Sequence, residues 1–335
     1  MEIIKHDVAN EIKYFDLFEF IDKINLSPRV LEHMESTNKD FDKYLKKFSK
    51  FDDNFAIYFW ISRFYSEIKN SNNIENHNLN NFDFTIANLF FDRLSVSNSR
   101  IHDIHRSVMK DEIDQSKVGT YRKTPVKVSS IYDDYEEIFW YGANPEDIKD
   151  FMNTYIDIYK SNSPSVLNSN PFIKSSLMHL LFLKIHPYFD GNGRTARMLH
   201  NIKFTQMINN IYGMNLKICP VNLSESIKLN LISYVKAPDN IYFDLEHNND
   251  EMINYWFNCM LNMYDEQLFR NQGILDNMDE DFEKIMRIKK RIDPKLLEKI
   301  KNIDADLGQM LDIKNKMNSE TREVIENMHV KKLKR

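Results

Sequence analysis

The chain has 335 residues, a formal net charge of −5 at pH 7, and charged residues at 28% of its composition. This balance is typical of a globular protein and excludes a nucleic-acid-coating protein, whose composition would be strongly basic. Only two cysteines occur, Cys219 and Cys259, so the sequence predicts neither a disulfide framework nor a cysteine-based zinc site. The first residues lack a signal-peptide pattern and no apolar stretch of about 20 residues occurs, so we expect a cytoplasmic protein without a membrane span.

Helical periodicity dominates the chain. Seven glycines and nine prolines leave few helix breakers, and apolar residues recur at spacings of three and four. The sequence therefore predicts a mostly α-helical protein. A first helical region covers residues 1–81, and residues 55–64 of it carry a broad apolar face suited to core packing. A second helical segment begins near Phe82.

The middle of the chain contains the strongest strand signal. Residues 119–132, GTYRKTPVKVSSIY, break the helical pattern, and the alternating Val126 and Val128 predict a short strand or hairpin. Two later dipeptides, at 144–145 and 170–171, place a capping Asn before a Pro and predict helix N-termini. A further helix, beginning near Arg194, is expected to end at Gly213.

The end of the chain differs in composition from the rest. Residues 270–335 are rich in Lys, Asp and Glu with apolar residues at helical spacing, which predicts a helical appendage broken at Asp293–Pro294. Its basic runs at 287–291 and 331–335 could contact nucleic acid, but the interleaved acidic residues favour a solvated or partner-binding helix. We therefore expect no nucleic-acid partner.

The stretch HPYFDGNGRTAR, residues 186–197, places two of the seven glycines one residue apart. Gly191 and Gly193 allow the backbone to approach an anion closely, and the loop leads into a helix N-terminus that favours phosphate. Asn192 adds amide donors, and Arg194 and Arg197 can form charge-assisted bonds to phosphate oxygens. The stretch therefore predicts a polyphosphate site.

Two further side chains complete this predicted site. Asp190 is a hard oxygen ligand suited to Mg²⁺ held together with substrate phosphates, and His186 has the side chain best matched to proton abstraction near neutral pH. Each residue alone also has a structural interpretation, as a helix-end histidine, a common turn or a solvent-facing arginine. Their co-occurrence within twelve residues favours a base, a metal ligand and an anion hole in one place.

This stretch resembles the signature of the Fic (filamentation induced by cAMP) family, H-P-F-x-(D/E)-G-N-G-R-x-x-R, with Tyr188 in place of the usual Phe. The resemblance extends over roughly residues 82–265 and implies a Fic-type helical bundle with a short β-hairpin flap. Residues 1–81 and 270–335 would be helical extensions of this core. The implied reaction is transfer of AMP from ATP to a Ser, Thr or Tyr hydroxyl of a target protein. The implied targets include the protein itself, modified within one chain or between the two copies of a homodimer.

The resemblance also implies a role for each residue of the motif. His186 would be the general base, Asp190 would hold Mg²⁺, and Arg197 would hold the γ-phosphate. The anion hole and the remaining catalytic groups would be Gly191, Asn192, Gly193 and Arg194. Relatives that transfer a terminal phosphate carry lysine at the second glycine, so Gly193 favours nucleotidyl transfer.

The flap would align a target segment by strand addition. The residues that would bind the target backbone are Thr124, Pro125, Val126, Lys127 and Val128. Because main-chain pairing carries little side-chain specificity, we considered the basic residues beside the flap, Arg122 and Lys123, as groups that would favour an acidic neighbour in the target.

The segment SNNIEN, residues 71–76, matches the pattern (S/T)-x-x-x-E-(G/N) of Fic relatives with an N-terminal inhibitory helix, known as class II. Placed at the end of a helix expected at about 55–76, it implies that Ser71, Glu75 and Asn76 form a brake in which Glu75 pairs with Arg197. Because the pattern is degenerate, the alternative is a polar helix end whose Glu75 faces water. Two other activities stay open: a bifunctional enzyme that also removes AMP through Glu75, and a nucleotide-binding regulator without turnover.

Overall fold

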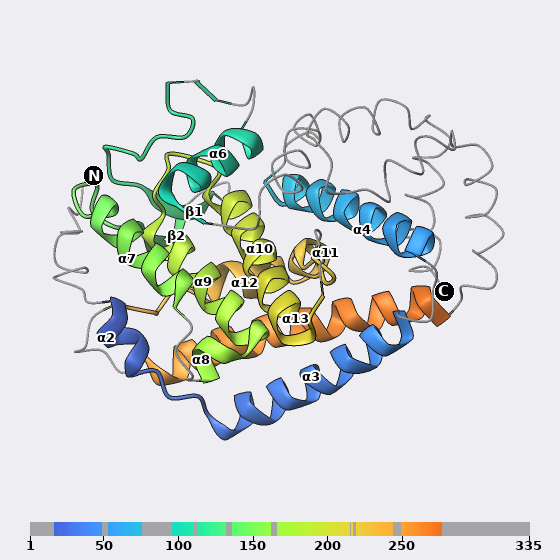
Figure 1. Cartoon of the computed structure of the whole chain (residues 1–335). Helices are drawn as coiled ribbons and strands as arrows, with labels where there is room; N and C mark the ends of the chain where they lie inside the picture. Colours follow the sequence, from blue (N-terminus) through green and yellow to red (C-terminus); the bar gives the residue numbers. More distant parts are fainter. Residues whose placement is uncertain are drawn as a thin grey trace.

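The computed structural model describes residues 17–48, 53–75, 96–109, 113–114, 116–131, 136–161, 166–214, 216, 219–243 and 249–276. Over these residues the chain is mostly helical with one two-stranded antiparallel sheet, which confirms the predicted fold class (Figure 1). Within the same residues, no helix is long and apolar enough to cross a lipid bilayer. Asn76, the predicted boundary near residue 81 and nearly all of the C-terminal appendage lie outside the described residues.

Two central helices, α9 (Pro171–Ile185) and α10 (Asn192–Tyr212), pack against each other and carry the glycine stretch between them. In α9 every residue but Lys184 is buried, as expected for a helix that is surrounded by others. Its N-cap is the predicted Asn170, whose Oδ1 accepts from two backbone N–H groups of the first turn. Helix α10 ends at the predicted Gly213, which has a left-handed backbone.

Helix α10 begins at Asn192, two residues before the predicted start at Arg194. The difference arises at Gly191, which forms the N-cap in a left-handed conformation with φ 75°. A residue without Cβ adopts this conformation at little steric cost. The helix N-terminus therefore lies inside the glycine pair rather than after it.

Around this centre, α6 (Asn98–Val108) and α7 (Ile148–Lys160) lie on the side of the hairpin, as Figure 1 shows. The hairpin consists of β1 (Lys127–Ile131) and β2 (Glu136–Tyr141), with Val128 opposite Trp140 and an irregularity after Val128. The expected hairpin is present, but only its first strand falls within the predicted residues 119–132, and its second strand follows them. The predicted cap at Asn144 was wrong: residues 145–147 form a turn, and α7 begins at Ile148 after the N-cap Asp147.

Two long helices, α3 (Pro28–Phe48) and α13 (Asp250–Asp276), run side by side along one edge (Figure 1). Polar contacts join them: His33 Nε2 lies 2.8 Å from Asp265 Oδ2, and Thr37 donates to Asp265 Oδ1 over 2.7 Å. Because α13 continues to Asp276, the domain boundary expected at residues 265–270 falls inside a helix.

Helix α4 (Asp53–Ile74) ends within the predicted inhibitory segment, directly before Glu75, and packs on α10 and on the short α11 (Ser224–Leu229). Its Glu67 side chain is buried and accepts from Asn201 Nδ2 (3.1 Å), from Ser224 Oγ (2.6 Å) and from the Ser224 backbone N–H (2.8 Å). One turn away, the buried Arg63 pairs with Glu225 at 3.0 Å. A buried carboxylate is tolerated only with such partners, so these contacts determine how α4 is rotated against α10.

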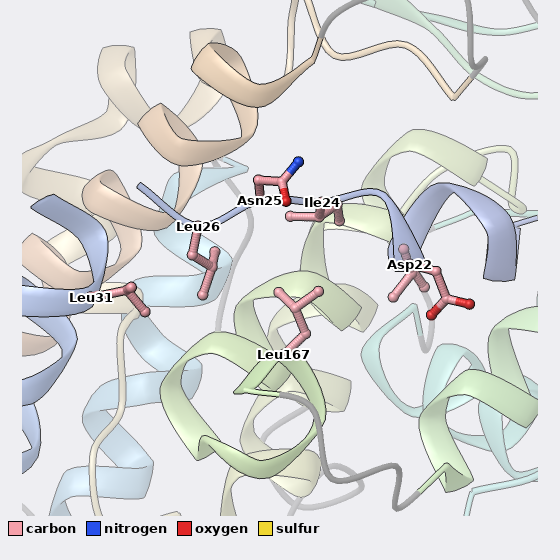
Figure 2. A pocket seen from close by; sticks show the side chains of 7 residues that line it. Asp22, Ile24, Asn25, Leu26, Leu31 and Leu167 are labelled. Carbon is pink, nitrogen blue, oxygen red and sulfur yellow. The ribbon is translucent and has the colours of Figure 1, made fainter. Parts of the chain in front are cut away.

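The remaining described elements are α2 (Leu17–Asp22), α8 (Val166–Ser169) and α12 (Leu231–Lys236). A pocket of about 320 Å³ opens where α8 faces the α2–α3 connection, and Figure 2 shows Leu167 pointing toward that connection. Its lining is mainly aliphatic, and the amide of Asn25 within it donates to Lys23 O and Asp250 Oδ2. None of its lining residues belongs to the sequence-predicted site.

Buried His200 makes the stability of the fold depend on pH. Burial lowers the pKa of His200 in α10 to about 3, against about 6.5 in an unfolded chain. Between these values the unfolded state binds more protons, so the free energy of unfolding falls as pH falls, by up to about 1.4 kcal/mol per pH unit. We expect the urea midpoint to decrease between pH 6.5 and 5.0, above the range in which most carboxylates titrate. In His200→Gln this decrease should be shallower; an unchanged slope would contradict the prediction.

Candidate active site

His186 lies at the end of α9 as its C-cap. With a φ of 50°, it is the one non-glycine residue in the described ranges that has a positive φ. Such a backbone conformation persists only where the surrounding structure holds it in place. The imidazole Nδ1 lies 3.1 Å from Leu183 O, so a neutral ring donates there and leaves Nε2 as the acceptor. Burial lowers the pKa of His186 to about 4, opposed by the Leu183 carbonyl and reinforced by Arg122, so the ring is neutral at pH 7. This is the state a general base requires.

The loop after His186 is held by its own side chains. Asn192 Oδ1 accepts from the Tyr188 N–H at 2.9 Å, and Asn192 Nδ2 donates to Tyr188 O at 2.8 Å. The side-chain amide predicted to face an anion is therefore occupied with the loop backbone. What Asn192 offers an anion is its main-chain N–H in the first turn of α10, where N–H groups have no intrahelical partner.

His105 of α6 supports the same loop and was missed by the sequence analysis. Its Nδ1 accepts from the Gly119 N–H (2.8 Å), so Nε2 carries the proton and donates to Asp190 O (2.9 Å). The Tyr188 ring stacks on the imidazole with centroids 3.7 Å apart. The only sequence signal is a histidine in the apolar stripe of α6, beside Ile101 and Ile104, which does not distinguish a loop support from a core residue.

A Cβ at either glycine of the motif would meet a neighbouring side chain, and Gly191 also has a left-handed backbone. A Cβ at Gly191 would lie 2.2 Å from Met109 Sδ, and one at Gly193 would lie 2.6 Å from Glu75 Oε1. Asp190 is half-buried beside them, and its Oδ1 accepts from the Gly191 N–H at 2.6 Å. The structure therefore places a carboxylate, two glycines and the N-terminus of α10 together, as the sequence predicted.

The two arginines of the motif are both buried and bind different partners. Arg194 donates from Nη1 to Val108 O at 3.2 Å, and its Nη2 contacts Met109 Sδ at the end of α6. Arg197 donates from Nε to Ser71 Oγ (2.8 Å) and from Nη2 to Ser71 O (3.0 Å). Neither guanidinium faces open solvent, which removes the solvent-facing interpretation for both.

Glu75, which directly follows α4, also contacts Arg197. Its Oε1 accepts from Arg197 Nη2 at 3.0 Å, with the arginine side chain 2% and the glutamate side chain 34% exposed. Burial by itself lowers the pKa of Arg197, but Glu75 and Tyr234 outweigh it and raise that pKa. Because the Glu75 carboxylate also lies against Gly193, it occupies the position at the α10 N-terminus where an anion would be stabilised.

The hairpin lies next to His186. Thr124, Pro125 and Lys127 are exposed, and Val126 and Val128 are half-buried. The Gly142 N–H donates to Val126 O at 3.1 Å, which joins the start of the flap to the end of β2. The hypothesis that Arg122 meets an acidic target residue does not hold, because its guanidinium is buried among backbone carbonyls.

The residues present fit a nucleotide-borne Mg²⁺ and do not form a metal cage. No group of three His, Cys, Asp or Glu side chains that could hold a metal ion occurs among the described residues. Asp190 by itself provides one carboxylate at the anion-binding helix N-terminus. Mg²⁺ typically binds through one or two carboxylates and substrate phosphates, so this donor set suits an ion that arrives with its nucleotide.

Comparison with known protein families identifies residues 95–202 as a match to the Fic/DOC family. A protein named protein adenylyltransferase Fic, from Nematostella vectensis, is 36% identical over 107 residues, which are 32% of this chain and 22% of that protein. Protein adenylyltransferase fic-1 of Caenorhabditis elegans is 29% identical over 111 residues, 33% of this chain and 19% of that protein. The match thus spans about a fifth of the length of these curated relatives.

Solved structures share the fold at low sequence identity. Fic-1 from C. elegans superimposes with a TM-score of 0.53 and 16% identity, covering 74% of this chain and 73% of that one. A Fic family protein from Desulfovibrio desulfuricans gives a TM-score of 0.50 and 13% identity, with 91% and 88% covered. These similarities extend the common fold beyond the segment that matches in sequence.

The reciprocal bonds between Asn192 and Tyr188 generate a stability prediction. Asn192→Ala leaves a buried N–H and a buried C=O of Tyr188 without partners, at about 1–3 kcal/mol each. We expect the free energy of unfolding, measured by urea denaturation, to fall by about 2–4 kcal/mol. The control Asn73→Ala removes an exposed amide on α4 and should change it by less than about 0.5 kcal/mol. Equal losses in both variants would show that Asn192 does not hold the loop.

Proposed function

Because residues 95–202 of this chain match the Fic/DOC family, we propose that the protein is an adenylyltransferase that moves AMP from ATP to a protein hydroxyl group. The curated relatives that match this domain carry the same activity in their names. One observation carries the proposal beyond resemblance: a neutral His186 with an accepting Nε2 lies on the loop that enters the N-terminus of α10.

The reaction follows from these groups. His186 Nε2 accepts the proton of a Ser, Thr or Tyr hydroxyl while the hydroxyl oxygen forms a bond to the α-phosphorus of ATP. The bond from that phosphorus to the bridging oxygen breaks, and pyrophosphate leaves. The N–H groups of Asn192 and Gly193 at the α10 N-terminus stabilise the negative charge on the transferring group. Gly193 leaves room for the phosphates, which a longer side chain would fill.

Asp190 is the residue that would hold Mg²⁺, which when bound neutralises part of the phosphate charge. Its carboxylate is oriented by the Gly191 N–H, and its backbone carbonyl is held by His105. Both contacts are made by the protein's own groups and fix the carboxylate and the loop backbone in place, which reduces the reorganisation needed at the time of reaction.

We infer that Glu75 acts as a brake on this reaction. Arg197 would bind the γ-phosphate, but its Nε and Nη2 are taken by Ser71 of α4 and by Glu75. The Glu75 carboxylate lies where a phosphate would approach Gly193, so ATP and Glu75 compete for one positive site. Glu67 and Arg63 hold the rest of α4 on α10 and α11, so Glu75 can leave Gly193 and Arg197 while the helix and the Ser71 bonds to Arg197 stay in place.

Removal of the Glu75 side chain should therefore increase the transfer activity of the enzyme. We expect Glu75→Gly, incubated with Mg²⁺ and ATP labelled at the α-phosphate, to gain the mass of one AMP or more, at least about 10-fold faster than wild type. Glu75→Gln keeps its bulk against Gly193 but loses the charge, and should gain an intermediate amount. Glu75→Gly/His186→Ala should show no transfer. Intact mass and autoradiography measure each result.

Two controls make the outcome specific. Asn73→Gly puts the same helix-weakening residue at an exposed position of α4 and should leave activity at the wild-type level. ATP labelled at the γ-phosphate should leave no label on the protein. Activation by Asn73→Gly would show that loosening of the helix, and not loss of the carboxylate, causes the effect. Label from the γ-phosphate on the protein would show that the reaction is phosphoryl transfer and not nucleotidyl transfer. Nucleotide binding without transfer by Glu75→Gly would favour the regulator without turnover.

A further inference from the structure

Arg122 is a buried cation whose side-chain hydrogen bonds all go to backbone carbonyls. Its Nε donates to His186 O (2.7 Å), Nη1 to Thr124 O (2.8 Å), and Nη2 to Ala143 O and, at 3.4 Å, to Ile185 O. Burial lowers the pKa of Arg122 to about 10, so the group is still charged at neutral pH. The guanidinium fork thus joins three segments, which are the end of α9, the start of the flap and the end of β2.

The carbonyls at the end of α9 explain why a cation fits here. The last turn of a helix leaves C=O groups without intrahelical partners and carries a partial negative charge. Arg122 satisfies Ile185 O and His186 O, and the Ala143 N–H adds a bond to Ile185 O at 3.2 Å. Gly142 makes this approach possible, since a Cβ there would lie 2.7 Å from Arg122 Nη2.

The same residue controls the backbone of the base. The backbone N–H of Arg122 donates to Pro187 O at 3.0 Å, so the carbonyls of three successive residues, 185 to 187, are all bonded to Arg122. The residue between them is His186, whose left-handed φ of 50° is unfavourable for an L-residue without such support. The position of the imidazole relative to the flap is therefore set from the flap side of the site.

We propose that Arg122 is a positioning residue for the transfer reaction, which locks the left-handed backbone of His186 to the flap. The inference rests on the proposed function and goes beyond it. A target hydroxyl held along the flap and the accepting Nε2 of His186 then keep a constant relation, because one guanidinium bonds to both Thr124 O and His186 O. Arg122 does not touch the substrate and acts through His186.

Replacing Arg122 with lysine tests the positive charge at this position separately from the hydrogen-bond geometry of the guanidinium. Arg122→Lys keeps a cation at the end of α9, but one ammonium group cannot bond to carbonyls of three segments in the directions that the planar fork reaches. In the Glu75→Gly background we expect kcat for target or self-modification to fall about 10- to 100-fold, as for a misplaced base. The KM for ATP should change less than about twofold, because the phosphates bind at α10. Arg122→Met should lose at least as much activity.

A second measurement does not depend on catalysis. In wild-type protein, histidine-selective NMR should show His186 in one neutral tautomer, protonated at Nδ1, with the signal assigned by its loss in His186→Gln. We expect both Arg122 variants to show mixed tautomers, since the ring loses its fixed relation to Leu183 O. Lys123→Met, which removes an exposed charge from the adjacent position, should keep the single tautomer.

The outcomes are distinct. A single parent-like tautomer together with parent-like kcat in Arg122→Lys would overturn the proposal. If the Glu75→Gly parent transfers no AMP, the proposed function fails, and the tautomer populations alone decide whether Arg122 positions His186. If Arg122→Met does not fold, the Arg122→Lys comparison carries the test, with thermal unfolding used to confirm that this variant is intact.

Discussion

The N-terminus of α10 is the feature on which the rest of the site depends. The first turn of this helix presents N–H groups and the positive end of the helix dipole, and the buried Arg197 adds a full charge one turn further on. A positive site of this kind, largely shielded from solvent, requires an anion. In the structure, Glu75, which directly follows α4, supplies it. The same electrostatics that would bind a polyphosphate therefore also bind the Glu75 carboxylate.

The proposed competition between Glu75 and a nucleotide depends on the packing of α4. Glu67, Ser71 and Glu75 are spaced four residues apart and so lie on one face of the helix. They meet Asn201 and Arg197, which are also four apart on α10. Of these three residues, Glu67 and Ser71 are buried and Glu75 is partly exposed, at 34% of its side chain. The contacts between α4 and α10 are thus buried at Glu67 and partly exposed to solvent at Glu75, where the helix faces the site.

Three buried arginines serve this small region, each with partners of a different chemistry. Arg122 bonds to carbonyls at the end of α9, Arg194 contacts a carbonyl and a thioether at the end of α6, and Arg197 bonds to a hydroxyl, a carbonyl and a carboxylate. The Arg197 partners include a negative charge that a phosphate could replace. The other two guanidinium groups hold helix ends in place, which keeps the base and the loop rigid.

The amino-acid sequence by itself determined the features that depend on local chemistry. The glycine pair, the caps at Asn170 and Gly213, the helical fold class and the four-residue spacing of Ser71 and Glu75 are all readable without a structure, because each follows from backbone φ, capping or helix period. The Ser71, Glu75 and Arg197 side chains do come together, as the resemblance implied.

Only the tertiary structure decided which way the polar side chains point. Asn192 bonds back to its own loop, His105 supports Asp190 from a different helix, and Arg122 is buried at the end of α9 instead of facing a target. The strand β2 was also decided by pairing with β1, since its sequence EEIFWY has no clear alternation. In each case the hydrogen-bonding or pairing partner is distant in the sequence or is a backbone group. Periodicity and spacing report which face of an element is apolar, but a hydrogen bond to a carbonyl 60 or more residues away leaves no pattern that one sequence can display.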